Sequence, residues 1–327
     1  MQQLSEYDYN LPKELIAQEP LKKRSDSRLL VVGESIEHKK FSDIVSILEK
    51  DDVLVLNNSK VIPARLMGKK ETGGKIEILL IRKLADNKWS CFVKGSIKDN
   101  ARIFFAKGYG IITKKDDCII DLFDVPINEI GIMPVPPYIK KRLSEPDRYN
   151  TVFAQEEGSI AAPTAGLHFT QELFKTMNEK GVKICFVTLH VGPGTFLPVK
   201  TKDICKHHMH EEYYTISEET ANSINARKNR LFIIGTTTLR ALESSTDKKG
   251  IVNAETGSTK LFIYPPYKFK LAFYALITNF HLPKSTLLML VSAIIGRERI
   301  IDIYTQAIKE KYRFFSFGDA MIVRHNS

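Results

Sequence analysis

The sequence predicts an α/β protein in which a discontinuous α/β domain, residues 1–67 and 134–327, carries an inserted small antiparallel β-barrel domain, residues 68–133. Two observations support this prediction. Helix-like and strand-like segments alternate before residue 67 and again after residue 134, a pattern typical of a sheet covered by helices. Between these parts the helical period disappears, and short apolar runs are separated by turns containing Gly, Asp and Asn, which favours an antiparallel barrel.

The first part of the α/β domain alternates short helices with strands. Residues 11–18 and 41–50 have helix-like spacing of apolar side chains, whereas residues 27–32 and 53–59 are apolar, strand-like runs. The inserted segment then contains five short strand-like runs, at residues 75–83, 89–95, 101–106, 110–115 and 118–123.

The α/β alternation resumes after the proline-rich run MPVPPYI. Gly181 is suited to end the first helix of this part, and Ser217 to cap the second. The predicted helices are residues 171–181, 217–228, 239–244 and 284–295. The predicted strands are residues 183–190, 231–235 and 275–280.

The composition is that of a chain with packed cores. Its 327 residues are 43% hydrophobic, enough for about two domains. The first residues lack the basic and apolar regions of a signal peptide, and the longest apolar run, residues 287–295, is about half a membrane span. The four cysteines form no Cys-x-x-Cys pair, so we expect reduced thiols. We therefore expect a cytoplasmic monomer without membrane association.

The charge of the chain suits a polyanionic partner. The formal net charge is +10, and lysines and arginines that neutralise phosphates gain affinity by releasing counterions. Residues 68–150 contain 16 Lys and Arg against 11 Asp and Glu, so this quarter of the chain supplies 5 of the 10 net charges. This segment, which includes the inserted domain, is thus a predicted RNA-facing surface. A generally basic composition without an RNA partner is the alternative.

Histidines gather in one part of the sequence. Five of the eight fall within 43 residues, in the runs APTAGLHFT, TLHVGPGTF and HHMHEEY. Because histidine titrates near neutrality, such a cluster among turn-forming glycines indicates proton transfer or ligand binding on loops. The cluster consists of His168, His190, His207, His208 and His210.

Three predicted strand ends carry polar residues at the positions where open α/β sheets bind ligands. The first is the glycine turn that contains Thr195, and the second is a run of three threonines followed by Arg240. The third contains Asn279 and His281. Helix capping by the threonines and hydrogen bonds from Asn279 and His281 to the backbone are the structural alternatives.

The HHMHEEY run also permits a metal site. His207 and His210 are spaced by one helical turn, and Glu212 or His208 would add a third ligand. The alternative is a histidine oriented by a neighbouring glutamate. Asp319, near the end of the chain, is either a turn residue or a ligand contact.

Taken together, these runs resemble the S-adenosylmethionine:tRNA ribosyltransferase-isomerase family of queuosine biosynthesis. The resemblance covers nearly the whole chain in order, and several such runs in the right order are specific. They are NNSKVIPARL, GGKIEILL, MPVPPYI, GSIAAPTAGLHFT, TLHVGPGTFLPV, HHMHEEY, GTTTLRALES, TNFHLP and EKYRFFSFGDAM.

The resemblance implies an α/β domain with an inserted barrel and a cytoplasmic enzyme. It also implies the reaction, in which the ribosyl part of S-adenosylmethionine moves onto 7-aminomethyl-7-deazaguanine at the tRNA wobble position and rearranges into epoxyqueuosine. Adenine and methionine leave. Two departures from the family pattern, Pro266 in place of Gly and Tyr274 in place of Asp, lie in one stretch, so no site role is carried over from it.

The reaction requires acid and base groups near neutrality, which leads to a hypothesis for the site. We assign His168 and His190 to proton transfer, with His210 and Glu212 as an oriented pair, and expect no metal. Substrate binding is assigned to Asn57, Arg65, Thr164, Thr195, Arg240, Asn279, His281 and Asp319.

Two other functions remain as alternatives. A metal-dependent hydrolase would use the His207, His210 and Glu212 set as ligands. A tRNA-binding protein without catalysis would explain the charge but not the histidines beside glycine turns.

Overall fold

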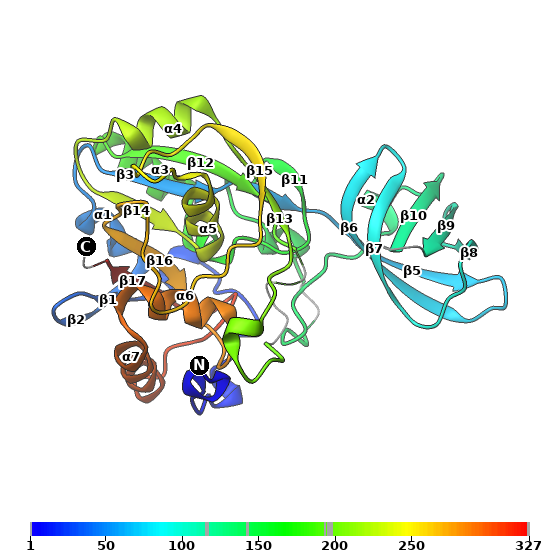
Figure 1. Cartoon of the computed structure of the whole chain (residues 1–327), viewed down its shortest axis with the longest axis horizontal. Helices are drawn as coiled ribbons and strands as arrows, with labels where there is room; N and C mark the ends of the chain where they lie inside the picture. Colours follow the sequence, from blue (N-terminus) through cyan, green and yellow to red (C-terminus); the bar gives the residue numbers. More distant parts are fainter. Residues whose placement is uncertain (1, 115–117, 142–143, 193, 195–198, 326–327) are drawn as a thin grey trace.

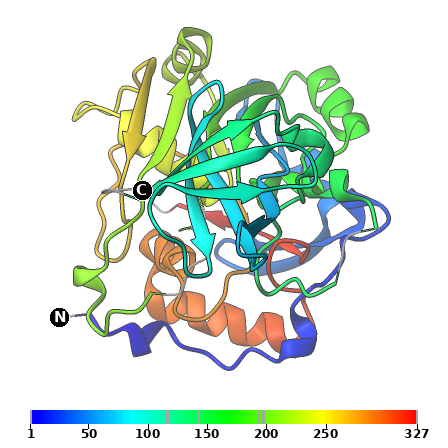
Figure 2. The same cartoon turned by 90° about the vertical axis from the view of Figure 1, so that its right-hand side faces the viewer.

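The computed structural model describes residues 2–114, 118–141, 144–192, 194 and 199–325. A nine-stranded mixed sheet forms the body, and a closed six-stranded barrel projects from one side of it (Figure 1). Figure 2 shows the barrel in front of the body. The predicted fold class, α/β with an antiparallel barrel, is therefore confirmed.

The sheet of the body has the order β15-β13-β12-β3-β14-β16-β17-β1-β2. Its centre is parallel, since β12, β3, β14 and β16 run in one direction, and its outer strands are mostly antiparallel. Central strands are buried on both faces and so read as continuous apolar runs such as VLVL in β3. The strands are β1 (Arg28–Val32), β2 (Ile36–Lys40), β3 (Val53–Asn57), β12 (Lys183–Leu189), β13 (Glu212–Ile216), β14 (Leu231–Ile234), β15 (Glu255–Thr259), β16 (Ala275–Asn279) and β17 (Ala320–Arg324).

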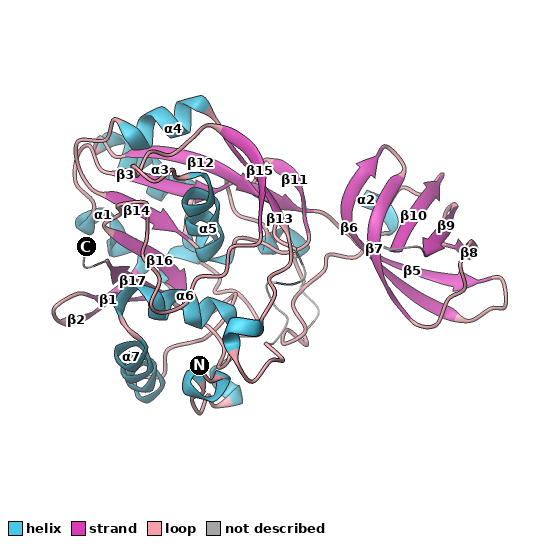
Figure 3. Cartoon of the chain, in the orientation of Figure 1, coloured by secondary structure: helices cyan, strands magenta, loops and turns pink. Residues whose placement is uncertain are grey.

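Helices cover both faces of this sheet (Figure 3). One face packs on α1 (Ile44–Ile47) and α3 (Gln171–Glu179). The other packs on α4 (Glu218–Asn225), α5 (Thr236–Ser245), α6 (Thr286–Ile295) and α7 (Arg297–Lys309). Thr170, Ser217 and Ser285 cap α3, α4 and α6, each accepting a hydrogen bond from a backbone amide of the first turn.

The barrel closes in the order β10-β7-β6-β5-β8-β9, with antiparallel neighbours throughout. Alternate side chains fill its interior, among them Ile78, Trp89 and Ile120. On the side of the body, the Arg82 guanidinium lies 4.6 Å from the ring centroid of Tyr213 in β13. The strands are β5 (Arg65–Lys70), β6 (Lys75–Ala85), β7 (Lys88–Lys94), β8 (Ala101–Phe104), β9 (Tyr109–Lys114) and β10 (Cys118–Phe123), followed by α2 (Ile127–Ile130).

Short segments between barrel and body complete the description. Strands β4 (Ser59–Val61) and β11 (Glu156–Ser159) form a separate parallel pair.

All four cysteines are free thiols, and the sulfur atoms of Cys91 and Cys118 lie 3.7 Å apart inside the barrel. No helix within the described residues is long and apolar enough to cross a bilayer.

Several predicted elements differ from the structure. The helix predicted at 11–18 is only the 3-10 turn Lys13–Leu15, and the helix predicted at 41–50 shrinks to a 3-10 turn and α1. An extended residue ends each of them, Ile16 after the first 3-10 turn and Leu48 after α1. The first barrel strand starts at Arg65, inside the part assigned to the α/β domain. Helix α7 was missed, although its buried positions are spaced as an amphipathic helix requires.

Candidate functional site

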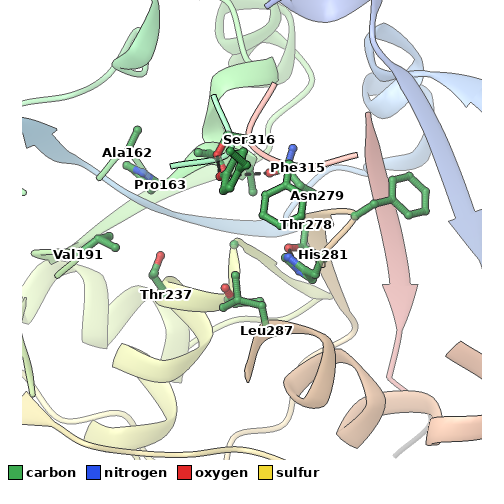
Figure 4. Close-up of a pocket in the computed structure, with 16 residues that line it drawn as sticks. Ala162, Pro163, Val191, Thr237, Thr278, Asn279, His281, Leu287, Phe315 and Ser316 are labelled. Carbon is green, nitrogen blue, oxygen red and sulfur yellow. Dashed lines mark hydrogen bonds between the residues drawn. The ribbon is translucent and has the colours of Figure 1, made fainter. Parts of the chain in front are cut away.

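A cavity lined by both polar and apolar side chains lies at the carboxyl ends of β14 and β16 (Figure 4). It contains about 480 Å³ of empty space, including its open mouth. Residues that follow neighbouring parallel strands meet at the same edge of the sheet, which is where open α/β sheets bind ligands. The described lining residues are Tyr138, Ala162, Pro163, Thr164, Ala165, Val191, Gly235, Thr236, Thr237, Thr278, Asn279, Phe280, His281, Leu287, Phe315 and Ser316.

The amino terminus of α5 forms one wall of this cavity. Gly235 precedes the helix with a φ of 88°, and no side chain among the described residues caps the helix. Thr236 and Thr237 line the cavity, while the Thr238 hydroxyl donates to the Ile234 carbonyl behind it. The uncapped amides and the helix dipole suit a carboxylate or another anion. The capping explanation of the three threonines is wrong, because the residue at the cap position is a glycine.

A chain of hydrogen bonds runs from the cavity wall into the core. The Thr164 hydroxyl donates to Asn279 Oδ1 at 3.0 Å, and Asn279 Nδ2 lies 3.1 Å from His168 Nε2. His168 Nδ1 lies 2.7 Å from the Ser27 hydroxyl. Because the amide nitrogen of Asn279 can only donate, His168 Nε2 accepts, and the proton of the neutral His168 ring lies on Nδ1. His168 therefore fixes the orientation of the Asn279 amide at the cavity wall.

His168 itself is removed from the cavity. Its side chain is buried and stacks on Phe41 with the ring centroids 4.9 Å apart. Burial, helped by the positive charges of Arg313 and Arg24, lowers the pKa of His168 to about 3. A ring that is neutral at pH 7 with both nitrogens engaged is a poor proton carrier. The structure thus favours a positioning role over the proton transfer predicted for His168.

His281 is the histidine that lines the cavity. Its Nε2 lies 3.0 Å from the Thr278 hydroxyl, and burial lowers its pKa to about 3. Its backbone is also held, since the amide donates to the Tyr304 hydroxyl at 3.0 Å and the carbonyl accepts from Tyr9. The ring is a neutral hydrogen-bonding group in a fixed position.

A buried ion pair supports the glycine turn beside the cavity. Arg240 and Glu212 are each 3% exposed, and an Arg240 Nη1 proton is donated to Glu212 Oε2. The other carboxylate oxygen accepts from the Gly192 amide at 3.0 Å, and Arg240 Nε donates to the Leu261 carbonyl at 3.0 Å. This geometry corrects the predicted pairing of His210 with Glu212. Arg240 is bound to the glutamate instead of being open to a substrate.

The remaining histidines of the HHMHEEY run lie near the surface. His210 is exposed and packs against Gly194, and the His207 ring contacts Phe262 with centroids 5.3 Å apart. In the described ranges no three His, Cys, Asp or Glu side chains converge as metal ligands. Glu212, the third ligand of the proposed metal set, is engaged by Arg240. Thr195 lies outside the described residues.

His190 belongs to a second cavity, along β12 and β13. This cavity has about 1030 Å³ of empty space including its mouth, and Glu156 and Glu219 line it. His190 Nδ1 is buried without a hydrogen-bond partner in the described part of the chain, and Gly158 covers the ring so closely that a Cβ there would lie 3.1 Å from it. Burial lowers the pKa of His190, and the Glu156 charge opposes this shift. The next residue, Val191, lines the first cavity.

Two predicted binding residues are occupied by the backbone. Asn57 donates to the Leu189 carbonyl at 2.9 Å and accepts from the amides of Leu189 and Ser59 at 3.0 Å, joining β3 to β12. Asp319 accepts from the amides of Arg28 and Arg313 at 2.9 and 2.8 Å. Both side chains are buried and outside the cavity lining, so the structure gives them positioning roles.

Arg65 lies where the barrel joins the body. It forms an ion pair with Glu77 at 3.3 Å and lines a third cavity of about 1540 Å³ of empty space, again counted with its mouth. Lys60, Lys140 and Lys141 line the same cavity. This position is compatible with phosphate contacts. Arg65 begins strand β5 of the barrel, whereas α5 belongs to the body.

The sequence reasoning missed several lining residues. The Tyr138 hydroxyl and the Ser316 hydroxyl lie 2.6 Å apart, and burial raises the pKa of Tyr138 well above its ordinary value. Thr278, beside His281, was also missed. Tyr138 stands in the MPVPPYI run and Ser316 in the FFSFGDAM run, so both runs were recognised while their hydroxyls were not assigned.

The fold and the cavity define an α/β protein with a cavity at the carboxyl edge of its sheet and an accessory barrel. The family model described as Queuosine biosynthesis protein matches residues 4–323. The chain belongs to this family, which confirms the resemblance drawn from its sequence runs.

Relatives of similar length carry one name. Proteins called S-adenosylmethionine:tRNA ribosyltransferase-isomerase from Desulforamulus reducens and Clostridioides difficile are 49% and 48% identical to this chain, each over 98% of it and 99% of the relative. A crystal structure of S-adenosylmethionine tRNA ribosyltransferase from Thermotoga maritima is 38% identical, with a TM-score of 0.56 over 97% of this chain and 99% of that one.

Proposed function

We propose that this chain is an S-adenosylmethionine:tRNA ribosyltransferase-isomerase. It transfers the ribosyl moiety of S-adenosylmethionine onto 7-aminomethyl-7-deazaguanine at the tRNA wobble position and forms epoxyqueuosine, with release of adenine and methionine. The observation that carries this proposal is that relatives 48–49% identical over both the body and the barrel share that name. We further propose that it acts as a cytoplasmic monomer and needs no metal.

The reaction makes three demands on the protein. The acceptor amine is nucleophilic only when neutral, so a group must hold or take its proton. The sulfonium of the donor acidifies its C5′ hydrogens, so a base placed there can start the rearrangement. The departing adenine must gain a proton or a hydrogen bond. The site therefore needs room for a donor that carries both a carboxylate and a sulfonium, and it needs at least one proton acceptor.

The donor fits the cavity at the ends of β14 and β16. This cavity lies at the carboxyl edge of the sheet, where open α/β sheets bind ligands. We assign its carboxylate to the uncapped amino terminus of α5 and its ribose to the hydroxyls of Thr164 and Thr236. Asn279, held by His168, and His281 would then orient the adenine or the ribose.

The acceptor amine fits the second cavity. Glu156 and Glu219 favour the cationic form on arrival, and His190, whose side chain lines this cavity, is the proposed proton acceptor. His190 and Val191 are consecutive and line the two different cavities. The reacting atoms would therefore meet near these two residues, just after the end of β12.

The chain divides into two domains with different proposed roles. We propose residues 1–67 and 134–327 as the catalytic domain and residues 68–133 as the barrel domain that faces RNA. Arg65, at their junction, would hold a phosphate near the target nucleotide together with Lys60 and Lys140.

The direct test uses S-adenosylmethionine labelled in its ribosyl part and tRNA that carries 7-aminomethyl-7-deazaguanine. We expect label in the tRNA, with adenine and methionine released in equal amounts and only when that tRNA is present. Chelator treatment should leave the rate unchanged. Formation of S-adenosylhomocysteine, or adenine release without tRNA, would contradict the proposed function.

Substitution by glutamine separates the roles of the histidines. Glutamine keeps one neutral hydrogen bond but cannot exchange a proton near neutrality. His190→Gln should lower turnover about 10² to 10⁴-fold, the usual contribution of a general acid or base. His168→Gln should keep more than about a fifth of the rate, since a lost neutral hydrogen bond costs only about 1 kcal/mol. A His190→Gln enzyme that melts normally and keeps its rate would make His190 structural.

A further inference from the structure

One row of outward side chains crosses five strands of the barrel. The strand register places Lys75 of β6 opposite Lys69 of β5, Lys69 opposite Phe104 of β8, Phe104 opposite Tyr109 of β9, and Tyr109 opposite Phe123 of β10. Directly paired residues point to the same side of a sheet. The row therefore forms a continuous strip of two lysines and three aromatic rings on the outer surface of the barrel. We call it the aromatic row.

Phe104 and Phe123 are the exposed rings of the aromatic row, and Phe123 is stacked on Tyr109. Phe104 is 43% exposed and Phe123 is 39% exposed. The rings of Tyr109 and Phe123 are nearly parallel, with an interplanar angle of 13° and centroids 4.8 Å apart. The Arg102 guanidinium lies 4.9 Å from the Tyr109 centroid. These contacts hold Tyr109 and Phe123 in place, so that Phe123 can present its ring at little further entropic cost.

The position of the row sets it apart from the cavities. Figure 1 shows β8 and β9, with the tip of the β5–β6 hairpin, at the end of the barrel remote from the body. None of the five residues lines the donor cavity, the second cavity or the junction cavity. The aromatic row is a separate surface, and a partner that reaches both it and the body must be long.

The charge around the row is positive. Lys69 and Lys75 form no salt bridge within the described ranges, whereas Lys107 nearby is paired with Glu129 at 2.5 Å. Exposed rings flanked by unpaired lysines combine stacking with phosphate neutralisation, the two features of surfaces that bind unpaired nucleotides.

We propose that the aromatic row binds unpaired bases of the RNA substrate, with Phe104 and Phe123 stacking on bases and Lys69 and Lys75 contacting phosphates. This inference rests on the proposed function, which supplies the tRNA. Recognition at the remote end of the barrel would add affinity and would help to fix the position of the RNA on the protein, without contacting the reacting nucleotide. A second copy of this chain, packed on the same rings, is the competing occupant. Two adjacent lysines of like charge disfavour such self-association.

The test is the variant Phe104→Ala/Phe123→Ala, assayed for binding to tRNA and for turnover. Each lost base stack should weaken tRNA binding about 5- to 150-fold and raise the KM for tRNA to match, with kcat and the KM for S-adenosylmethionine unchanged. Ile251→Ala is the matched control, because Ile251 is a 45% exposed apolar side chain on the body. Both variants should melt near wild type, since outward side chains are removed.

A second variant tests the lysines. Lys69→Gln/Lys75→Gln should flatten the dependence of log affinity on log salt by about 1 for each lysine. Wild-type tRNA affinity and full turnover in the aromatic variant would overturn the aromatic row while leaving the proposed function intact. A wild-type dimer that the aromatic variant dissociates, with tRNA affinity unchanged, would also overturn it. A wild-type protein that binds no tRNA would refute both.

Discussion

The body and the barrel place their polar groups in opposite ways. In the body, Arg240, Glu212, His168 and His281 are buried, and each is held by specific hydrogen bonds. In the barrel, the interior is apolar and the charged side chains lie on the outside, as in the exposed Lys83–Asp86 pair. A buried polar group is costly unless it is satisfied, whereas an exposed one exchanges freely with water. The body thus holds its polar side chains in fixed positions, whereas the charged side chains of the barrel are free to adjust.

The largest expected difference concerns ion pairs. Arg240→Ala leaves the Glu212 carboxylate buried without its partner, which should lower the free energy of unfolding by about 3–5 kcal/mol. Lys83→Ala, which breaks an exposed pair in the barrel, should leave stability near wild type. Urea unfolding of both variants gives the comparison. Equal effects would mean that burial does not distinguish the two regions.

The second difference is a pH dependence that comes from the body. In the folded chain, burial keeps His168 and His281 neutral down to a pKa of about 3, whereas in the unfolded chain each takes up a proton near its ordinary pKa of 6.5. The unfolded state binds more protons between these values, so stability falls as the pH drops from about 6.5 toward 3. Between pH 7 and pH 5 each histidine should cost about 2 kcal/mol.

His168→Gln provides the control for this titration. The variant should lose about 2 kcal/mol less stability than wild type between pH 7 and pH 5, because the His168 imidazole no longer titrates. Urea unfolding at the two pH values measures the difference. A wild-type protein and a variant with the same pH dependence would show that His168 is not buried as a neutral ring.

A smaller effect is expected at the donor cavity. Thr236→Val removes one hydroxyl from the first turn of α5 and keeps the shape of the side chain, so the KM for S-adenosylmethionine should rise about fivefold, as for one hydrogen bond. Thr113→Val on the barrel strand β9 is the control and should leave this KM unchanged at saturating tRNA. An unchanged KM in Thr236→Val would move the donor away from α5.

The smallest effect is expected for single charges on the barrel. The affinity for tRNA should fall steeply with added salt, yet Lys94→Gln, which removes one 85% exposed side chain, should weaken binding less than about threefold. Filter binding over a range of salt concentrations measures both quantities. A salt-independent affinity would exclude a phosphate-contacting barrel.

Local patterns were enough to predict many of the elements. Apolar runs such as VLVL in β3 and LFII in β14, and the cap Ser217, identified central strands and helix α4 because their signals lie within a few neighbouring residues. The resemblance of several ordered runs identified the family. The short segments at 11–18 and 41–50 misled the prediction because their helical spacing is too brief to outweigh flanking extended residues.

The sequence by itself determined the α/β class, the inserted barrel, the basic charge and the family. Only the tertiary structure decided which polar side chains meet. Arg240 and Glu212 are 28 positions apart, and His168 and Asn279 are 111 apart, so no local pattern could pair them. The tertiary structure also decided the protonation of His168 and His281, because a pKa depends on burial and on neighbouring charges that the fold brings together. His168, one of the two histidines predicted to transfer protons, became a buried support for Asn279, while His281 came to line the cavity.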